Sequence, residues 1–265
     1  MNIGVLIAAW RTYRRNIKGR KFEPEIKFLK NILKKGDVCL HIGASDARHT
    51  YVMSNIIGEG QVYAFEPSSY SFGHLDLMVK LHRLKNVKTF HMAVSDRSGT
   101  VCLMTPQKST GHAGRSFAFI ANLNNADVKR TDIESSSMSS EEVQAISVDD
   151  FMSENAINRL DFIRCDTEGS EMLILKGAVK AIDECKPNLL IEIHAEALKK
   201  VFNSSTKEVV SFLLDRGYRM FREDNGKISE VKEVNETEVW KDYFFIHTSR
   251  IEGLPEGPFL QILKA

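Results

Sequence analysis

The sequence has little cysteine, little proline and no long hydrophobic run. Its four cysteines are widely spaced and form no CxxC pair, which argues against a small disulfide scaffold and favours a reducing setting. The longest apolar stretch near the start, Ile3 to Trp10, is far shorter than the roughly 20 residues that cross a bilayer. It precedes a basic cluster instead of following one, an order that argues against a secretory signal. We therefore expect a cytoplasmic protein.

Several catalytic signatures are also missing from the sequence. It has no Walker phosphate loop, no HExxH motif and no GxSxG motif, so phosphoryl transfer and motif-based hydrolysis receive no support. A full GxGxxG fingerprint is absent too, which disfavours an NAD(P) oxidoreductase. The 265 residues are 43% hydrophobic and 27% charged, a composition that suits one globular domain with a sizeable core.

The chain has almost no net charge, since 36 basic residues face 35 acidic ones. This balance gives no reason to expect nucleic acid as a partner. The charge is unevenly distributed, because residues 1–35 contain ten basic and two acidic residues, a net charge of +8, and the remaining residues carry −7. We interpret residues 1–35 as a basic accessory segment with helical structure. Such a segment is more often a solvated helical face, and the alternative is peripheral contact with an anionic membrane.

Short apolar runs rich in Val, Ile and Phe alternate with segments of helical periodicity, which is typical of a parallel sheet flanked by helices. We expect this main domain to span residues 36–250 and a tail to follow at 251–265. A polar turn from Asp224 to Gly226 predicts an antiparallel pair at the sheet edge. The expected strands are 38–42, 61–65, 87–93, 100–104, 160–165, 188–193, 218–222 and 243–248, and the expected helices include 47–57, 69–83, 170–182 and 205–216.

Residues 106–141 break this alternation. Ser, Thr, Asn, Asp and Gly dominate there, and the segment ends in a run of serines. Long polar segments inside compact domains are usually functional or disordered. We predict a long loop or lid that contributes to substrate binding.

The first two strand exits indicate a ligand site, because ligands of open parallel sheets bind beyond the carboxyl ends of the strands. Gly43, followed by Ala44 and Ser45, lets the backbone approach a ligand closely at the start of a helix. Glu66 ends the second run, 23 residues after Gly43, near the spacing at which an acidic side chain accepts both ribose hydroxyls of an adenosine cofactor. Pro67 turns the chain outward and presents Glu66 to the crevice. The alternative places Glu66 beside the cap of the next helix.

The third exit contains Ser95 and Asp96. Asp96 either accepts a hydrogen bond from an adenine amino group or begins the turn toward Gly99. Three polar exits in order favour an adenosine site more than any one of them does.

The fourth and fifth exits bring carboxylates and a histidine to the same edge of the sheet. Asp166 follows one apolar strand, and Glu192 and His194 lie on one face of the next because side chains alternate along a strand. If the two strands are neighbours, these three side chains converge. His194 is then a candidate general base oriented by Glu192. The alternative is a structural ion pair of Glu192 with Arg164 or His194. A site for Mg²⁺, Mn²⁺ or Fe²⁺ is less favoured, because no metal-specific spacing is present.

Together these motifs resemble the FkbM family of S-adenosylmethionine-dependent O-methyltransferases. The resemblance covers about residues 36–200, and the ordered set is far more specific than any one motif. The motifs are 36–50, 62–67 (VYAFEP), 93–96 (AVSD), 147–150 (SVDD), 161–169 (DFIRCDTEG), 175–177 (LKG) and 187–194.

The resemblance implies an α/β class I methyltransferase fold, a Rossmann-like three-layer sandwich whose seven-stranded, mostly parallel sheet has an antiparallel edge strand. It also implies methylation of a hydroxyl on a sugar, glycan or related small molecule. The Gly43 loop, with Ala44, would face the methionine portion of the cofactor, Glu66 with Pro67 the ribose, and Asp96 with Ser95 the adenine. His194 or Asp166 would take the proton of the acceptor, and Asp166 would also contact the cofactor.

The sequence departs from the family pattern Asp-x-Gly-Ala-Asn-x-Gly in one motif. His41 stands in the first acidic position, which in the family helps to hold the amino group of the cofactor, and Ser45 and Ala47 replace Asn and the second Gly. The contact to the amino group is therefore replaced or lost. The alternative to an active enzyme is a catalytically degenerate binding module with the same fold.

Overall fold

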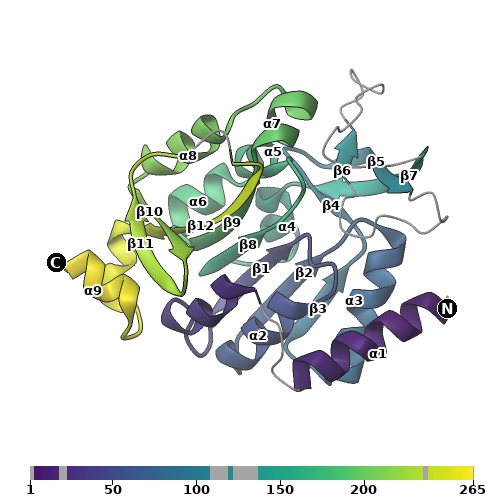
Figure 1. Ribbon diagram of the computed structural model, residues 1–265, viewed down its shortest axis with the longest axis horizontal. Coiled ribbons are helices and arrows are strands. Elements are labelled where there is room, and N and C mark those ends of the chain that lie inside the picture. Colours follow the sequence, from purple (N-terminus) through teal and green to yellow (C-terminus); the bar gives the residue numbers. More distant parts are fainter. Residues whose placement is uncertain (1–2, 18–22, 108–118, 122–136, 235–237, 265) are drawn as a thin grey trace.

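The computed structural model describes residues 3–17, 23–107, 119–121, 137–234 and 238–264 (Figure 1). The helices are α1 (Ile3–Ile17), α2 (Arg48–Ile57), α3 (Ser69–Leu81), α4 (Val148–Glu154), α5 (Glu171–Lys176), α6 (Val179–Cys185), α7 (Ala195–Phe202), α8 (Thr206–Leu214) and α9 (Pro258–Lys264), with 3₁₀ helices η1 (Pro24–Asn31) and η2 (Thr248–Gly253). The strands are β1 (Val38–Ile42), β2 (Gln61–Phe65), β3 (Val87–Phe90), β4 (Ala93–Val94), β5 (Gly99–Gln107), β6 (Phe119–Ala121), β7 (Ser137–Ile146), β8 (Phe162–Cys165), β9 (Asn188–His194), β10 (Tyr218–Asp224), β11 (Lys227–Val231) and β12 (Trp240–His247).

The main sheet has the strand order β11-β10-β12-β9-β8-β1-β2-β3. Strands β3, β2, β1, β8 and β9 are parallel, and β12 runs antiparallel between β9 and β10. This arrangement confirms the class I methyltransferase fold. The sheet has one strand more than the seven expected, because the turn from Asp224 to Gly226 joins β10 to an additional edge strand, β11. The reversed last strand, β12, is internal because β10 lies beyond it, and β11 is the antiparallel edge.

Alternation along the strands divides the core into two layers. In β1, Cys39 packs with η1, α2 and α9, whereas Leu40 and Ile42 pack with α4, α5, α6 and α8 on the other face. The three-layer sandwich follows from this alternation. Segments from both ends of the chain join the first of these cores, through Leu29 of η1 and Phe259 of α9. The boundaries proposed at residues 36 and 250 stay a prediction.

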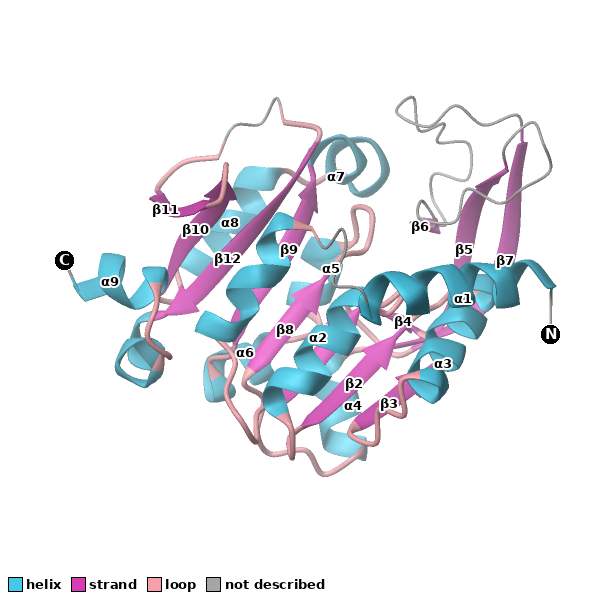
Figure 2. Cartoon of the chain, turned by 60° about the horizontal axis from the view of Figure 1, so that its bottom comes forward, coloured by secondary structure: helices cyan, strands magenta, loops and turns pink. Residues whose placement is uncertain are grey.

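A second sheet has the order β4-β7-β5-β6 and stands beside the main sheet (Figure 2). Its centre is a long antiparallel pairing of β5 with β7, in which Gln107 faces Ser137. The predicted loop is therefore wrong at its two ends, where 106–107 and 137–141 are strand, and 119–121 forms β6. A two-stranded ladder is held by backbone hydrogen bonds, so a serine-rich composition does not prevent it. Residues 108–118 and 122–136 of the predicted lid lie outside the described residues.

Two expected elements are each divided in the structure. The strand expected at 87–93 splits into β3 of the main sheet and β4 of the second sheet. The helix expected at 170–182 ends at Gly177 and restarts as α6. At that point a Cβ on Gly177 would lie 2.1 Å from the backbone oxygen of Ser95, so the helix break sits where two segments approach closely.

Helices α1 and α9 lie at opposite ends of the molecule (Figures 1 and 2). Among the helices that the structure describes, none combines the length and the hydropathy needed to cross a membrane.

Candidate active site

A cavity of about 410 Å³ lies at the carboxyl ends of the central strands. It gathers almost all of the site residues expected from the sequence, and only Ser95 and Asp96 are missing from its wall. The expected residues that line it are His41, Gly43, Ala44, Ser45, Glu66, Pro67, Asp166, Glu192 and His194.

The Gly43 turn forms the tightest part of the wall. Gly43 has a φ of +80°, and a Cβ at this position would lie 1.8 Å from the backbone oxygen of Asp166. The backbone N–H groups of Gly43 and Ala44 both donate to the carbonyl oxygen of Phe65, at 3.0 and 2.9 Å. Only glycine allows the exits of β1 and β8 to approach so closely.

Glu66 is held at the exit of β2 by two backbone donors. The N–H of Ser45 donates to Glu66 Oε2 and the N–H of Ser68 donates to Oε1, each at 2.9 Å. The residue is 6% exposed, and burial raises the pKa of Glu66 to about 7, although both hydrogen bonds lower it. The turn that begins at Gly43 is thus joined to Glu66 by a direct hydrogen bond, as the spacing of the two residues in the sequence suggests.

The third strand exit contributes differently from expectation. Ser95 is buried and its Oγ lies 3.2 Å from Asp96 Oδ1, and neither residue lines the cavity. The apolar residues just before them, Met92 to Val94, form the wall instead. The second sheet adds two further apolar side chains to the wall, Leu103 from β5 and Ile120 from β6, which are not among the expected site residues.

Asp166, Glu192 and His194 converge as the neighbouring strands β8 and β9 require. One side-chain oxygen or nitrogen atom of each residue, able to bind a metal ion, lies within 4.8 Å of the other two. His194 is 6% exposed, its Nδ1 lies 3.4 Å from Glu168 Oε2, and its Nε2 lies 3.6 Å from Glu192 Oε2. Within the described part of the chain, His194 Nε2 is buried without a hydrogen-bond partner.

Arg164 lies beneath this cluster and is only 2% exposed. Its Nη1 donates to Asp242 Oδ1 at 2.6 Å and its Nη2 donates to Asp166 Oδ2 at 3.1 Å, and Nη2 lies 3.9 Å from Glu192 Oε2. The ion pair considered as the alternative role of Glu192 is thus present. Burial raises the pKa of Asp166 to about 7 against the lowering effect of Arg164. Asp242, from the reversed strand β12, is a residue that no sequence motif indicated.

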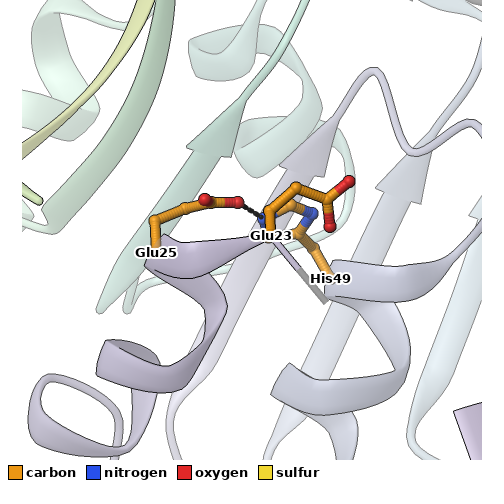
Figure 3. A group of neighbouring side chains, drawn as sticks. All are labelled: Glu23, Glu25 and His49. Atoms are coloured by element: carbon orange, nitrogen blue, oxygen red, sulfur yellow. Dashed lines mark hydrogen bonds and ion pairs between the residues drawn. The ribbon is translucent and has the colours of Figure 1, made fainter. Parts of the chain in front are cut away.

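A second polar cluster lines the same cavity from η1 and the start of α2, as Figure 3 shows for three of its side chains. His49 Nε2 lies 3.1 Å from Glu25 Oε1, and both residues are buried. Arg48 pairs with Glu23 and with Asp46. The sequence reading missed this cluster because its two glutamates precede the first strand, where no strand exit marks them.

His41 is 2% exposed, and its Nδ1 lies 2.6 Å from Thr50 Oγ1. Its ring packs edge-on against that of His49, with centroids 5.8 Å apart. Burial lowers the pKa of both histidines well below the usual value, so both are uncharged at neutral pH. The turn that follows has left-handed backbone at two non-glycine residues, Ser45 with φ 38° and Ala47 with φ 64°.

Comparison with known proteins identifies a domain in the sequence. The Methyltransferase FkbM domain matches residues 37–220. No curated protein matches the sequence significantly.

Solved structures with similar folds include three methyltransferases. A putative rRNA methylase from Clostridium thermocellum has 10% identity and a TM-score of 0.47 over 84% of this chain and 92% of that one. A precorrin-6y C5,15-methyltransferase from Geobacter metallireducens has 13% identity and a TM-score of 0.42 over 84% of each chain. A SAM-dependent O-methyltransferase from Thermotoga maritima has 10% identity and a TM-score of 0.42 over 86% of this chain and 66% of that one. The match over residues 37–220 shows that this chain belongs to the FkbM family of S-adenosylmethionine-dependent methyltransferases.

Proposed function

We propose that this protein is an O-methyltransferase that methylates a hydroxyl of a sugar, a glycan or a related small molecule. The observation that carries the proposal is the position of Trp240 beside His194 at the cavity. These two residues are partners across β12 and β9, both line the cavity, and Trp240 is 57% exposed. An exposed aromatic face suits the C–H groups of a sugar ring, while a neighbouring polar side chain suits its hydroxyls.

The cavity fits the cofactor of the family. The backbone of the first turn, from Gly43 to Ser45, lines the cavity, so a ligand can lie against it. Glu66 offers carboxylate oxygens to ribose hydroxyls, and the apolar wall from Met92 to Val94 suits an adenine ring. S-adenosylmethionine supplies a methyl group activated by its sulfonium sulfur.

The remaining task of the protein is to align the acceptor oxygen and to remove its proton. We assign the proton to His194 Nε2, which is buried and makes no hydrogen bond among the described residues. Glu168, whose Oε2 lies 3.4 Å from Nδ1, is placed to orient the ring, and Glu192, 3.6 Å from Nε2, would stabilise the ring once it holds the proton. Asp166 is the alternative base, and burial places its pKa at about 7.

A divalent cation held by Asp166, Glu192 and His194 is the less favoured version of this site. The guanidinium of Arg164 lies 3.1 Å from Asp166 and 3.9 Å from Glu192, so it already balances the charge of both carboxylates. A cation between them would be placed close to this buried positive charge.

The test is methyl transfer from isotope-labelled S-adenosylmethionine to a panel of cell-surface sugars and lipid-linked glycans, read by mass spectrometry. We expect an acceptor that gains one methyl group. His194→Ala and Asp166→Asn are expected to lower turnover, by about 100-fold for the residue that acts as the base, with unchanged binding of S-adenosylhomocysteine. Unchanged turnover in both variants would contradict the assignment of the base.

The contribution of Trp240 has a matched control in its neighbour Val239, which is 52% exposed. Trp240→Ala is expected to raise KM for a sugar acceptor about tenfold, while Val239→Ala leaves KM unchanged. Binding of the cofactor without methyl transfer to any acceptor would support the degenerate binding module instead.

A further inference from the structure

The wall of the cavity formed by η1 contains a buried carboxylate, Glu25, that no Lys or Arg of the described residues contacts directly. Glu25 is 4% exposed and lines the cavity. Among the described residues, its ion-pair contact is with His49 Nε2, at 3.1 Å (Figure 3). Because burial lowers the pKa of His49 well below its usual value, that ring supplies a hydrogen bond and no positive charge at neutral pH. Burial raises the pKa of Glu25, and a cationic ligand in direct contact would favour its charged form.

Neither of the described arginines that line the cavity, Arg48 and Arg164, forms an ion pair with Glu25. Arg164 is held by Asp242 and Asp166, and Arg48 pairs with Glu23 and Asp46. Both guanidinium groups lower the pKa of Glu25 through space, without a direct contact to it.

The cofactor carries the missing group. Its amino-acid end has an ammonium and a carboxylate, whereas its adenosine end has neither. The ammonium matches Glu25, which lines the cavity.

The residue at the exit of β1 cannot take this role. His41 is buried and uncharged, and its Nδ1 is engaged with Thr50. Its ring packs against His49, which in turn contacts Glu25. The carboxylate of Glu25 thus comes from η1, which lies before the matched domain at residue 37.

We propose that Glu25 binds the ammonium group of the amino-acid end of S-adenosylmethionine, and that η1 thereby completes the cofactor site. This inference concerns the cofactor alone and is independent of the identity of the acceptor.

The experiment is calorimetry with two ligands that differ in the amino-acid end. S-adenosylhomocysteine has this end, and 5′-methylthioadenosine lacks it. Glu25→Gln is expected to weaken binding of S-adenosylhomocysteine at least about tenfold and to leave the affinity for 5′-methylthioadenosine unchanged. The control Glu23→Gln, which alters a half-buried neighbour paired with Arg48, is expected to have a much smaller effect on either ligand.

Equal losses for both ligands, or no loss for S-adenosylhomocysteine, would overturn the proposal. If Glu25→Gln does not fold, the wild-type protein still gives an answer with the deaminated analogue of S-adenosylhomocysteine. The proposal requires this analogue to bind at least about tenfold more weakly than the parent ligand. Equal binding of the two would refute it.

A separate observation concerns helix α1. It packs against α3 through the side that contains Ala9 and Thr12, which are 0% and 2% exposed. The opposite side exposes apolar residues together with two arginines. Leu6, Ile7 and Trp10 are 40%, 48% and 55% exposed, and Arg11 and Arg14 are also exposed.

We infer that this face of α1 binds an anionic lipid surface. Exposed Trp and aliphatic side chains insert at the level of lipid headgroups, and adjacent arginines pair with anionic lipids. The +8 charge of residues 1–35 complements such a surface. A glycan carried on a lipid would then be brought close to the enzyme.

Flotation of the full chain with phosphatidylglycerol-containing vesicles tests this inference, with pure phosphatidylcholine vesicles for comparison. We expect binding only to the anionic vesicles and its loss in the triple variant Leu6→Ser, Ile7→Ser, Trp10→Ala. Leu81→Ser, at the end of α3 and 36% exposed in the wild type, is the matched control and should bind normally. Absence of binding, or dimerisation through α1 instead, would overturn the inference.

Discussion

Gly43 and Asp166 approach so closely that a Cβ on the glycine would lie 1.8 Å from the aspartate backbone oxygen. Gly43→Ala must therefore push apart the exits of β1 and β8, and we expect it to abolish measurable binding of S-adenosylhomocysteine. Gly36→Ala is the matched control. Gly36 also has a positive φ, +84°, but its Cβ would meet no atom within 4 Å. That control should lose about 1 kcal/mol of stability and retain full affinity. Equal affinities of the two variants would contradict this explanation.

Arg164 is expected to be essential for stability, because it is buried among three carboxylates. Arg164→Met removes the charge that balances Asp166, Glu192 and Asp242, and we expect a loss of about 3–5 kcal/mol in the free energy of unfolding. Urea titration measures the loss. Arg219→Met breaks an ion pair with Glu230 whose side chains are 31% and 25% exposed, and it should cost less than about 1 kcal/mol. Similar losses in both variants would contradict the distinction.

Ala47 occupies a left-handed position where the family pattern has glycine. Replacing it with glycine removes a buried methyl group, which costs about 1 kcal/mol, but relieves backbone strain worth about 1–2 kcal/mol. We expect Ala47→Gly to change the free energy of unfolding by less than about 0.5 kcal/mol once the flexibility of glycine is included. Ala44→Gly loses a similarly buried methyl without any positive φ to relieve, so it should cost about 1.5 kcal/mol. A large loss in Ala47→Gly would argue against strain at this turn.

Glu66 is expected to contribute to the pH dependence of stability, together with Asp166, whose pKa burial also raises to about 7. The pKa of Glu66 is about 7 in the folded protein, against an ordinary value of 4.5, so the folded state holds a proton that the unfolded chain releases. Stability therefore falls as pH rises from about 5 to 8 in the cofactor-free protein. Glu66→Gln should reduce this fall by about 3 kcal/mol. Thermal unfolding across this pH range measures it. Replacing Glu59, which is exposed, with Gln should leave the profile unchanged.

Ligands of parallel sheets bind beyond the carboxyl ends of the strands, and this rule is why most of the site residues could be predicted from the sequence. Gly43, Glu66 and Asp166 follow different strands, and His194 ends another, so their convergence depends only on the strand order. The same rule could not indicate Glu25, because η1 is positioned by packing of Ile26 and Leu29 against the sheet. It also could not place Asp242 opposite Glu192, since that pairing depends on the register of the reversed strand.

The serine-rich end of the segment 106–141 shows a different limit. Composition there indicated a loop, but residues 137–141 pair with β5 through the backbone. Backbone pairing leaves little trace in side-chain composition when one face of a ladder is exposed. The apolar run at 117–120 indicates an anchor for this segment, but only the pairing of β5 with β6 places Leu103 and Ile120 at the wall of the cavity.

Residues 37–220, which carry the family signature, form only part of the cavity wall. Glu25 reaches it from before this region, and Trp240 and Asp242 reach it from after. Selection can therefore alter the flanks while the shared signature stays intact. Relatives with the same motifs should be grouped by the residues equivalent to Glu25 and Trp240, because two chains that agree throughout the signature can still differ in how they hold the cofactor and in what they methylate.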